Sequence, residues 1–379
     1  LLEKEEYTRT EVADDAHLIL VNTCSVREHA EEKVHARLGN LKVFKDRNPD
    51  VKIGLLGCMA QNLKEDLLKS KPYVDIILGP DSYRKLPDMI ALPADTKENI
   101  VDTKLSRMEV YEDLFPARRE GINAWISIMR GCDKFCTFCI VPFTRGRERS
   151  RSIDSIVEEV KLIRDDGFKE VTLLGQNVNS FQHEGRRFHE LLNEVSQIEG
   201  IERIRYTSPH PQDFDDELIQ VHATNPKICN HIHFPLQAGS DVVLERMNRT
   251  YTKQHFLDLA QKMRKNIPGL ALSTDMIVGF PGETEADFLE TLDVMEQVKF
   301  DTAFTFKYSS RPGTKAAEYE DTVAEDDKQD RLERMIAMQR EHTLLRNREH
   351  IGEQVEVLVE KNSKKSENQH QGRTRSNKI

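Results

Sequence analysis

Met129-Arg130-Gly131-Cys132-Asp133-Lys134-Phe135-Cys136-Thr137-Phe138-Cys139 is the stretch around which the chain is organised. It holds three of the six cysteines of the chain within eight positions. A loop with three thiolates can bind one face of a metal centre and leave one coordination position open. Structural zinc sites usually have four protein ligands, and [4Fe–4S] clusters usually have four cysteines. The spacing therefore predicts a metal centre with a free position, and a half-formed zinc site or a group of buried thiols is the alternative.

The composition is that of a globular protein with more than one domain. The chain has 379 residues, of which 38% are hydrophobic and 32% charged, and this length predicts two or three domains. No apolar run reaches the roughly 20 residues that span a bilayer, and no secretory signal opens the sequence. Few cysteines in a chain of this size favour a reducing, cytoplasmic location over a disulfide framework. The net charge of −10 restricts any nucleic-acid contact to local basic patches.

The N-terminal part reads as an open parallel α/β sheet, which we assign to residues 1–95 with a linker over 96–121. Apolar runs at 17–22, 52–57 and 74–79 predict buried strands, and helical patterns at about 26–45 and 60–70 lie between them. Cys24 and Cys58 each follow a strand. Because ligands bind beyond the carboxyl ends of parallel strands, the two thiols are expected at one edge of the sheet, although two unrelated core cysteines are the alternative. No GxGxxG loop is present.

Residues 122–349 read as six strand–helix repeats, which predict a full or partial (β/α) barrel. Each expected strand is followed by a loop of small and polar residues, as suits the mouth of a ligand site. Cys229, His231 and His233 could bind a metal, but isolated strand residues are the simpler interpretation. The expected strands are 124–129, 170–174, 203–207, 231–235, 271–278 and 302–308.

The C-terminal part begins with a long amphipathic helix at about 326–349. Alternation over 354–360 then predicts a strand, and residues 350–379 form a separate small β element. The chain opens with Leu1 rather than Met, and we expect its natural start to lie further upstream.

Several motifs together resemble the methylthiotransferases of the radical S-adenosylmethionine superfamily. The cysteine triplet with Phe138 and the segment Gly279-Phe280-Pro281-Gly282-Glu283 are similar to the superfamily motifs. The longer string from Arg130 to Arg151, and Asn22-Thr23-Cys24 with Gly57-Cys58-Met59-Ala60-Gln61, resemble the methylthiotransferase family. Leu174-Gly175-Gln176-Asn177-Val178-Asn179-Ser180 resembles the members that act on isopentenyladenosine in tRNA. The resemblance covers nearly the whole chain.

The resemblance implies a partial (β/α)6 barrel between an N-terminal sheet and a truncated C-terminal TRAM β-barrel. It also implies two [4Fe–4S] clusters, S-adenosylmethionine as cofactor and cysteine ligands to both clusters. Cys132, Cys136 and Cys139 would bind the radical cluster. Cys24 and Cys58 would bind the auxiliary cluster, whose third cysteine is expected upstream of Leu1. The implied cofactor-binding residues are Phe138, Gln176, Asn177, Gln237, Ser240, Ile277, Val278 and Gly279.

The implied substrate is the anticodon stem-loop of a tRNA. Arginines at alternate positions after the triplet are expected to meet phosphates, although a solvated charge run is the alternative. The implied partners include an electron donor such as a flavodoxin or ferredoxin, and we expect a monomer without a membrane. Related family members that modify a ribosomal-protein aspartate or threonylcarbamoyladenosine, a non-catalytic Fe–S RNA-binding protein and a zinc module are the other hypotheses. The expected substrate-binding residues are Arg145, Arg147, Arg149 and Arg311.

Overall fold

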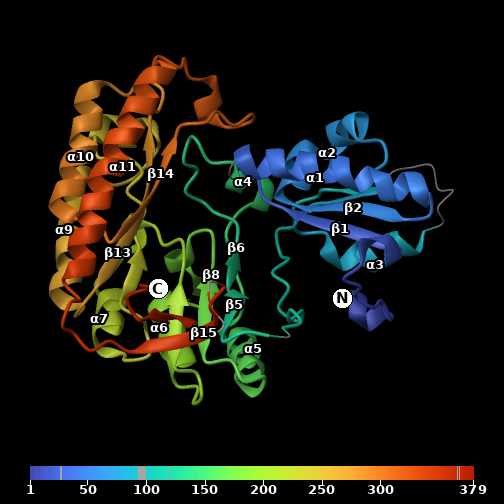
Figure 1. The fold of residues 1–379 in the computed structure, drawn as a ribbon, viewed down its shortest axis with the longest axis horizontal. Coiled ribbons are helices and arrows are strands. Elements are labelled where there is room, and N and C mark those ends of the chain that lie inside the picture. The colour runs from blue at the N-terminus through green and yellow to red at the C-terminus, as the bar shows by residue number, and fades with distance from the viewer. Residues whose placement is uncertain (26–27, 93–99, 119, 365, 367) are drawn as a thin grey trace. The chain divides into compact units, whose positions relative to one another are not determined.

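The computed structural model describes residues 1–25, 28–92, 100–118, 120–364, 366 and 368–379. Residues 26 and 27, where the first helix was expected to begin, lie outside the described residues, as do residues 93–95 of the expected N-terminal domain and residues 96–99 and 119 of the expected linker. The chain divides into two compact units. Unit 1 comprises Leu1–Val110, Gly131–Asp133 and Cys139–Arg149, and unit 2 comprises Tyr111–Arg130, Lys134–Phe138 and Ser150–Ile379 (Figure 1).

Unit 1 contains a four-stranded parallel sheet in the order β1-β2-β3-β4. One hydrophobic cluster packs Leu38 and Leu67 of its longer helices against the sheet, and a second packs Leu86 of a short helix against other sheet residues. The predicted open parallel α/β sheet is therefore confirmed. Its elements are β1 (Leu18–Thr23), α1 (Glu28–Arg47), β2 (Lys52–Gly57), α2 (Cys58–Ser70), β3 (Ile76–Leu78), α3 (Leu86–Ala91), β4 (Ile100–Asp102) and α4 (Val141–Arg145).

Strand β4 corrects the sequence-based interpretation, which placed these residues in a linker. Its three residues pair in parallel with β3, and the amide of Gly79 donates to the Asp102 carbonyl at 2.8 Å. A run of only two apolar residues, Ile100 and Val101, is too short to give a strand signal by periodicity. The sheet of unit 1 therefore extends further along the chain than expected.

Unit 2 holds the six predicted strands as two three-stranded parallel sheets, β11-β8-β5 and β12-β13-β14. Ile204 of β11 also pairs with Ile228 in a single parallel bridge. The α/β class and the parallel strands are confirmed, while a continuous six-stranded ladder is not formed. Figure 1 shows α9 (Lys253–Asn266), α10 (Glu285–Val298) and α11 (Glu325–Arg348) side by side along β13 and β14. The strands are β5 (Asn123–Ser127), β8 (Glu170–Leu174), β11 (Arg203–Tyr206), β12 (His231–His233), β13 (Ala271–Val278) and β14 (Thr302–Lys307), with the short β6 (Met129–Arg130), β7 (Arg149–Ser150), β9 (Gln182–His183) and β10 (Arg186–Arg187).

The helices of unit 2 follow from apolar residues at helical spacing. In α5 the Ser152 hydroxyl accepts from the Ser155 amide at 3.3 Å and so caps the helix, as the sequence predicts. Ile156 and Val160 of that helix are fully buried. The helices are α5 (Ile153–Asp165), α6 (Phe188–Ser196), α7 (Asp216–Thr224), α8 (Asp241–Arg246), α9 (Lys253–Asn266), α10 (Glu285–Val298) and α11 (Glu325–Arg348).

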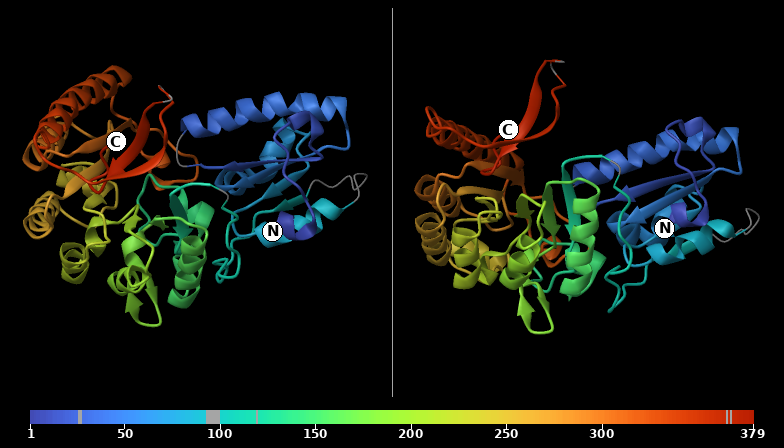
Figure 2. Two further views of the ribbon diagram at one scale, coloured as in Figure 1. Left: turned by 60° about the horizontal axis from the view of Figure 1, so that its bottom comes forward. Right: turned by 90° about the horizontal axis from the view of Figure 1, so that it is seen from below.

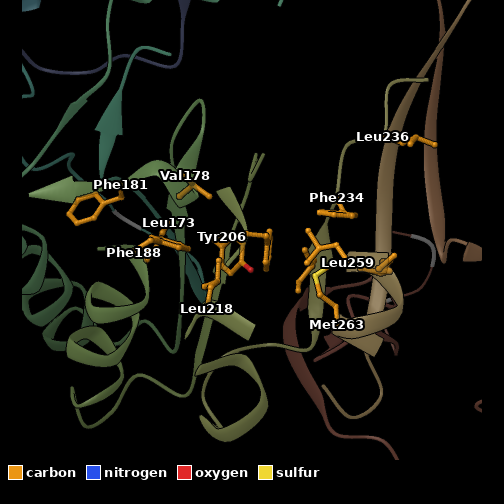
Figure 3. Packing of buried hydrophobic residues seen from close by; sticks show 14 of the residues in the cluster. Leu173, Val178, Phe181, Phe188, Tyr206, Leu218, Phe234, Leu236, Leu259 and Met263 are labelled. Atoms are coloured by element: carbon orange, nitrogen blue, oxygen red, sulfur yellow. The ribbon is translucent and has the colours of Figure 1, made fainter. Parts of the chain in front are cut away.

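One continuous hydrophobic core lies beneath both sheets of unit 2. Figure 3 shows Leu173 and Tyr206 from one sheet and Phe234 and Met263 from the other half of the same core. Phe234 stacks on Phe256 with ring centroids 4.3 Å apart. Because burial of one such side chain contributes about 1.5–3 kcal/mol, this core fixes the strand ends from which the polar loops project.

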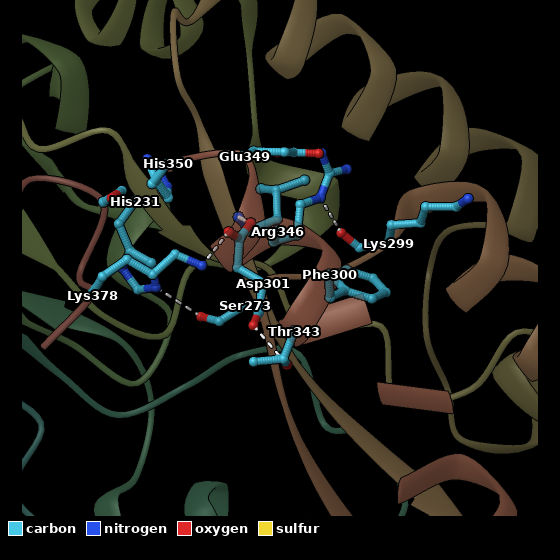
Figure 4. Close-up of polar contacts among 12 residues, drawn as sticks. His231, Ser273, Lys299, Phe300, Asp301, Thr343, Arg346, Glu349, His350 and Lys378 are labelled. Atoms are coloured by element: carbon cyan, nitrogen blue, oxygen red, sulfur yellow. Dashed lines mark hydrogen bonds and ion pairs between the residues drawn. The ribbon is translucent and has the colours of Figure 1, made fainter. Parts of the chain in front are cut away.

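The C-terminal segment forms an antiparallel pair, β15 (Val357–Asn362) and β16 (His370–Thr374), which Figure 2 shows in red as one ribbon. Arg203 of β11 donates to the Arg373 carbonyl at 2.7 Å, and Lys378 pairs with Asp301 at 2.7 Å (Figure 4). These bonds attach the two-stranded ribbon to Arg203 of β11 and to Asp301, which both lie elsewhere in unit 2. The truncated TRAM β-barrel implied by the resemblance stays a prediction.

Helices of the membrane-crossing kind, long and uniformly apolar, do not occur in the part of the chain that the structure describes.

Candidate functional site

Two of the predicted site cysteines lie at the same edge of the unit 1 sheet. Strands β1 and β2 are neighbours, and their last residues, Thr23 and Gly57, stand opposite each other in the parallel register. Cys24 and Cys58 follow directly. Cys58 is buried, whereas Cys24 is exposed. The structure therefore places both thiols at the carboxyl end of the sheet, where the strand–turn pattern predicted them.

The residues beside these cysteines fix the start of helix α2, whose first residue is Cys58. Gly57 has φ +96°, and a Cβ there would lie 2.5 Å from the Thr23 carbonyl oxygen, so glycine permits the close approach of the two strand ends. The Thr23 hydroxyl donates to the Leu56 carbonyl at 2.6 Å and accepts from the Met59 amide at 3.2 Å. One threonine thus joins β1, the end of β2 and the first turn of α2.

An arginine from a distant part of the sequence contacts the Cys58 sulfur. Nε of Arg145, at the end of α4, lies 3.0 Å from Sγ of Cys58 within unit 1. Burial acts to lower the Arg145 pKa, but the charge and hydrogen bond of Cys58, with Tyr83 and Asp81, outweigh it and raise the pKa. The guanidinium therefore stays charged.

A buried ion pair holds the segment that carries Arg145. Arg149 and Asp81 pair at 3.1 Å, with side chains only 7% and 1% exposed. Arg149 also donates to the Arg145 carbonyl at 3.1 Å. The Asp81 carboxylate in turn accepts from the Ser106 amide at 3.0 Å. The backbone of Arg145 is therefore fixed by contacts inside unit 1.

The central cysteine triplet falls where the chain passes from one unit to the other. Cys132 and Cys139 belong to unit 1 and Cys136 to unit 2, and all three side chains are partly exposed. The Cys132 amide donates to the Gly146 carbonyl at 3.1 Å. Gly131 has φ +81°, and a Cβ there would lie 2.0 Å from the Arg147 carbonyl oxygen. Position 131 therefore requires glycine, because any side chain there would clash with the backbone of Arg147.

Within unit 2 a second arginine contacts a cysteine sulfur. Nη1 of Arg249 lies 3.2 Å from Sγ of Cys136, and its Nε donates to the Tyr251 hydroxyl at 3.1 Å. That hydroxyl donates to the Leu236 carbonyl at 2.8 Å. Burial acts to lower the Arg249 pKa, but Tyr251 and Cys136 outweigh it, so the pKa is raised. Sequence reasoning missed Arg249 because its partner is 113 positions away; the basic string from Arg246 to Arg249 was the available signal.

Several predicted cofactor-binding residues come together in unit 2. The Phe138 ring lies edge-on to Phe280, with centroids 6.4 Å apart. The Ile277 amide donates to the Gln237 carbonyl at 2.9 Å, which brings the fourth-strand loop beside β13. Gly279 has φ +70°, and its amide donates to Glu283 at 2.6 Å. Val278, between them, is fully buried.

Other predicted cofactor-binding side chains already have partners inside unit 2. The Ser240 hydroxyl donates to Asp287 at 2.5 Å. Asn177 is buried and donates to Asp213 at 2.8 Å, while Gln176 is partly exposed. Contact between these residues and a cofactor stays a prediction.

The arginines after the triplet do not share one exposed face. Arg145 contacts Cys58 and Arg149 pairs with Asp81, as described above, whereas the Arg147 side chain is 71% exposed beside Asp133. Arg311 is partly exposed. Phosphate contact by all four stays a prediction, and for Arg145 and Arg149 it would require the side chains to leave these partners.

The strand histidines form a hydrogen-bonded group with residues of β13. His231 and His233 both lie 3.0 Å from the Ser273 hydroxyl, and His233 is 3.1 Å from Asp275. Burial raises the pKa of the Cys229 thiol. The described residues contain no group of three or more His, Cys, Asp or Glu side chains arranged to hold a metal ion.

The thiols fit the chemistry of iron–sulfur ligation. Cluster irons are bound by cysteine thiolates, and hydrogen bonds to the sulfurs adjust the cluster potential. Cys58 and Cys136 each receive such a hydrogen bond from an arginine. The cation beside each sulfur compensates the negative charge that a thiolate-bound cluster brings. The cysteine thiols are therefore of the donor type that iron–sulfur clusters take.

Comparison with known sequences covers the whole chain. The Radical SAM superfamily profile matches residues 126–295, and the Uncharacterized protein family UPF0004 profile matches residues 1–79. A tRNA-2-methylthio-N(6)-dimethylallyladenosine synthase of Acetivibrio thermocellus is 46% identical over 384 residues, with 100% of this chain and 80% of that protein covered. The synthase of the same description from Porphyromonas gingivalis strain W83 is 48% identical over 389 residues, with 100% and 84% covered.

Comparison with solved structures shows the same fold. The radical S-adenosylmethionine methyltransferase TsrM from Kitasatospora setae, with cobalamin and [4Fe-4S] cluster bound, has a TM-score of 0.60 at 15% identity over 79% of this chain and 66% of that chain. The cobalamin-dependent S-adenosylmethionine radical enzyme OxsB has a TM-score of 0.55 at 14% identity over 86% and 48%.

Proposed function

Because this chain belongs to the family of tRNA-2-methylthio-N(6)-dimethylallyladenosine synthases within the radical SAM superfamily, we propose that it adds a methylthio group to C2 of an isopentenylated adenine in tRNA. The observation that carries this conclusion is 44–48% identity to such enzymes over the full length of the chain. In this proposal the cysteines fall into two sets. One set would serve radical formation and the other would serve sulfur delivery.

Cys132, Cys136 and Cys139 would hold the radical [4Fe–4S] cluster. When bound, this cluster supplies the electron that cleaves S-adenosylmethionine into methionine and a 5′-deoxyadenosyl radical. Arg249 holds the Cys136 sulfur by a hydrogen bond. Phe138, in the cysteine loop, and Gly279, directly after β13, would hold the adenosine part of the cofactor.

Cys24 and Cys58 would provide two ligands of the auxiliary [4Fe–4S] cluster, through which the sulfur is delivered. S-adenosylmethionine serves twice in this proposal, as methyl donor and as the source of the radical that removes the C2 hydrogen. Thr23 and Gly57 keep the two cysteines at one sheet edge.

The substrate is tRNA, and we propose that the modified base is position 37 beside the anticodon. Arg147, whose side chain is 71% exposed, and Arg311 are the arginines best placed to meet phosphates. The proposal includes a flavodoxin- or ferredoxin-type electron donor, a monomeric enzyme and a cytoplasmic location. The C-terminal ribbon would contribute to RNA binding as part of a TRAM domain.

Anaerobic turnover followed by mass spectrometry of the nucleosides tests the proposal. The reduced, reconstituted protein is incubated with S-adenosylmethionine and tRNA that carries isopentenyladenosine without the methylthio group. We expect methionine, 5′-deoxyadenosine and 2-methylthio-isopentenyladenosine. Modification of threonylcarbamoyladenosine or of a ribosomal-protein aspartate instead would assign the chain to a related activity. Absence of 5′-deoxyadenosine would favour a non-catalytic iron–sulfur RNA-binding protein.

A further inference from the structure

A polar cluster lies on the inner face of the sheet β12-β13-β14, which is the face turned away from the helices. Residues of a strand alternate between the two faces of its sheet. Leu272 and Met276 of β13 are fully buried in the core with the helices, so Ser273 and Asp275 lie on the inner face. Phe304 of β14 stands beside Asp275 in the parallel register and shares that face. The inner face therefore carries polar side chains next to an aromatic ring.

Hydrogen bonds hold the Asp275 carboxylate in one orientation. Because a carboxylate only accepts, Nε2 of His233 donates to Oδ2 of Asp275 at 3.1 Å. Nδ1 of the neutral ring then accepts from the Ser273 hydroxyl at 3.0 Å, and this oxygen accepts from Nε2 of His231 at 3.0 Å (Figure 4). Burial and the nearby Arg205 guanidinium lower the pKa of His231 to about 3, so that imidazole stays neutral. The cluster is therefore a rigid support for one acceptor.

The same carboxylate has a second oxygen, and an exposed ring lies next to it. Among the described residues, no hydrogen-bond donor contacts Oδ1 of Asp275, whose side chain is 30% exposed. Phe304 is 48% exposed, and its ring lies edge-on to His233 with centroids 6.0 Å apart. Enzymes that modify a base take it out of the stack, bind it against aromatic side chains and read its edge by hydrogen bonds. A fixed acceptor beside an open aromatic ring supplies both contacts.

We propose that Asp275 and Phe304 bind the adenine base of the RNA substrate. The Asp275 carboxylate accepts the one N6–H that isopentenylation leaves on the base, and the Phe304 ring stacks on the base. This inference deepens the proposed function and rests on it, because that function defines the base. A base without a hydrogen on N6 would leave the carboxylate desolvated and unpaired, which is how a polar site rejects an analogue.

The position of the cluster suits a reaction with the cofactor. Ile277, a predicted cofactor-binding residue, lies two residues beyond Asp275 on the same face of β13, a distance of about 7 Å along a strand. At the amino-terminal ends of the strands, the C-terminal ribbon is bonded to Arg203, the first residue of β11, and Lys378 pairs with Asp301, directly before β14. The ribbon therefore occupies that end of the inner face, and the base would enter from the carboxyl end.

Two other roles for Asp275 make different predictions. A contact with S-adenosylmethionine would change the affinity for the cofactor and leave the choice between bases unchanged. A purely structural role in the sheet would weaken the binding of every RNA alike. The choice between two bases that differ only at N6 therefore separates base recognition from both.

The test compares RNA binding by the full chain without turnover, in the absence of S-adenosylmethionine. Two fluorescently labelled anticodon stem-loop RNAs carry either isopentenyladenosine or the same nucleoside with a methyl group on N6, which removes its N6–H. Anisotropy measures the affinity for each RNA. Quenching of Trp125 reports the arrival of the base, because Trp125 is the only tryptophan of the chain and is 55% exposed.

The variants are chosen in matched pairs. Asp275→Asn weakens the acceptor and keeps its shape, and Asp293→Asn is its control, because the Asp293 side chain is 51% exposed on α10. Phe304→Leu removes the aromatic ring and Phe304→Tyr keeps it. The affinity of each variant for S-adenosylmethionine is measured separately.

We expect the parent chain to prefer the isopentenyladenosine RNA by about tenfold. Asp275→Asn should lose this preference, and Asp293→Asn should keep it. Phe304→Leu should weaken the binding of both RNAs by about tenfold and reduce the quenching of Trp125, whereas Phe304→Tyr should bind as the parent does.

A preference that survives in Asp275→Asn, an equal loss of both RNAs in that variant, or a change in cofactor affinity alone would overturn the inference. A parent chain that forms the methylthio nucleoside but binds the two RNAs equally would overturn it as well and leave the proposed function in place. Preference for the isopentenyladenosine RNA that depends on Asp275, without product formation in the turnover experiment, would support the recognition and overturn the proposed function alone.

Discussion

Cys58 in unit 1 and Cys136 in unit 2 each receive a hydrogen bond from a guanidinium, but the two arginines are held differently. The backbone of Arg145 is fixed by Arg149, whose partner is the buried Asp81 carboxylate. Arg249 is instead held by neutral oxygens, the Tyr251 hydroxyl at 3.1 Å and the Pro235 carbonyl at 3.4 Å. The sulfur partner of unit 1 therefore depends on a buried ion pair, and that of unit 2 depends on uncharged groups.

The two sites therefore differ in how the charge of the arginine is balanced. In unit 2 the charge of Arg249 is shared between a sulfur and neutral acceptors, so it remains available to an anionic group beside Cys136. In unit 1 the nearby carboxylate is already paired with Arg149, and Arg145 contacts the Cys58 sulfur.

Removal of one cysteine from each site should give the largest effect and separate the two roles. Cys136→Ala should abolish 5′-deoxyadenosine formation, because the radical cluster loses a ligand. Cys58→Ala should keep that cleavage and lose formation of the methylthio nucleoside. Liquid chromatography with mass spectrometry measures both products in one reaction.

Cys229→Ala is the control for this pair, since that thiol is buried in unit 2 outside both sites. It should leave both products at the parent level. Methylthio product from Cys58→Ala, or continued cofactor cleavage by Cys136→Ala, would show that the two sites are not assigned correctly.

Neutralising Asp81 should destabilise unit 1 more than any exposed charge in the same segment. Asp81→Asn leaves the Arg149 guanidinium buried beside an uncharged group, and breaking a buried pair costs about 3–5 kcal/mol. Arg147→Gln removes an exposed pair with Asp133, which is worth about 0–1 kcal/mol. Denaturant unfolding followed by hydrogen exchange in α2 and α4 measures both. Equal effects from the two substitutions would contradict the dependence of unit 1 on the buried pair.

The strands could be predicted from the sequence because burial on both faces produces continuous apolar runs. Strands β2, β8 and β13 begin and end where those runs do, and polar loops follow each of them. The triplet and the two strand-end cysteines were visible for the same reason, since both depend on local spacing. Strand β4 was missed because two apolar residues give no period.

The partners of the cysteines could not be predicted, because they depend on contacts between distant residues. Cys58 and Arg145 are 87 positions apart, and Cys136 and Arg249 are 113 apart. Alternation from Arg145 to Arg151 suggested that these arginines together meet phosphates. The structure ends a helix at Arg145 and gives Gly146 a positive φ, so these arginines point to different neighbours.

Acid should destabilise unit 2 through its buried histidines, an effect separate from the arginine contacts. Burial lowers the pKa of His222 to about 3, and its Nε2 lies 2.7 Å from the Tyr206 hydroxyl. The folded state keeps His222 neutral, whereas the unfolded chain binds a proton below about pH 6.5. Stability is therefore lost as the pH falls from about 6.5 toward 3, by about 2 kcal/mol at pH 5.

His222→Gln removes this proton uptake, so the difference in unfolding free energy between pH 7 and pH 5 should shrink by about 2 kcal/mol. Chemical denaturation at both pH values, followed by hydrogen exchange in α7, measures the change. An unchanged pH difference would show that other groups of unit 2 control its response to acid.

Thr23 offers the smallest and most local test of the unit 1 site. Thr23→Val keeps the shape of the side chain but removes the hydroxyl that joins the Leu56 carbonyl and the Met59 amide. Leaving two buried backbone groups unsatisfied should cost about 1–3 kcal/mol. Thr23→Ser keeps the hydroxyl and should cost less. Hydrogen exchange in the first turn of α2 should become faster in the same order, because Thr23 fixes the start of α2 and therefore Cys58. If Thr23→Val lowered stability without faster exchange in that turn, the position of Cys58 would not depend on the strand ends.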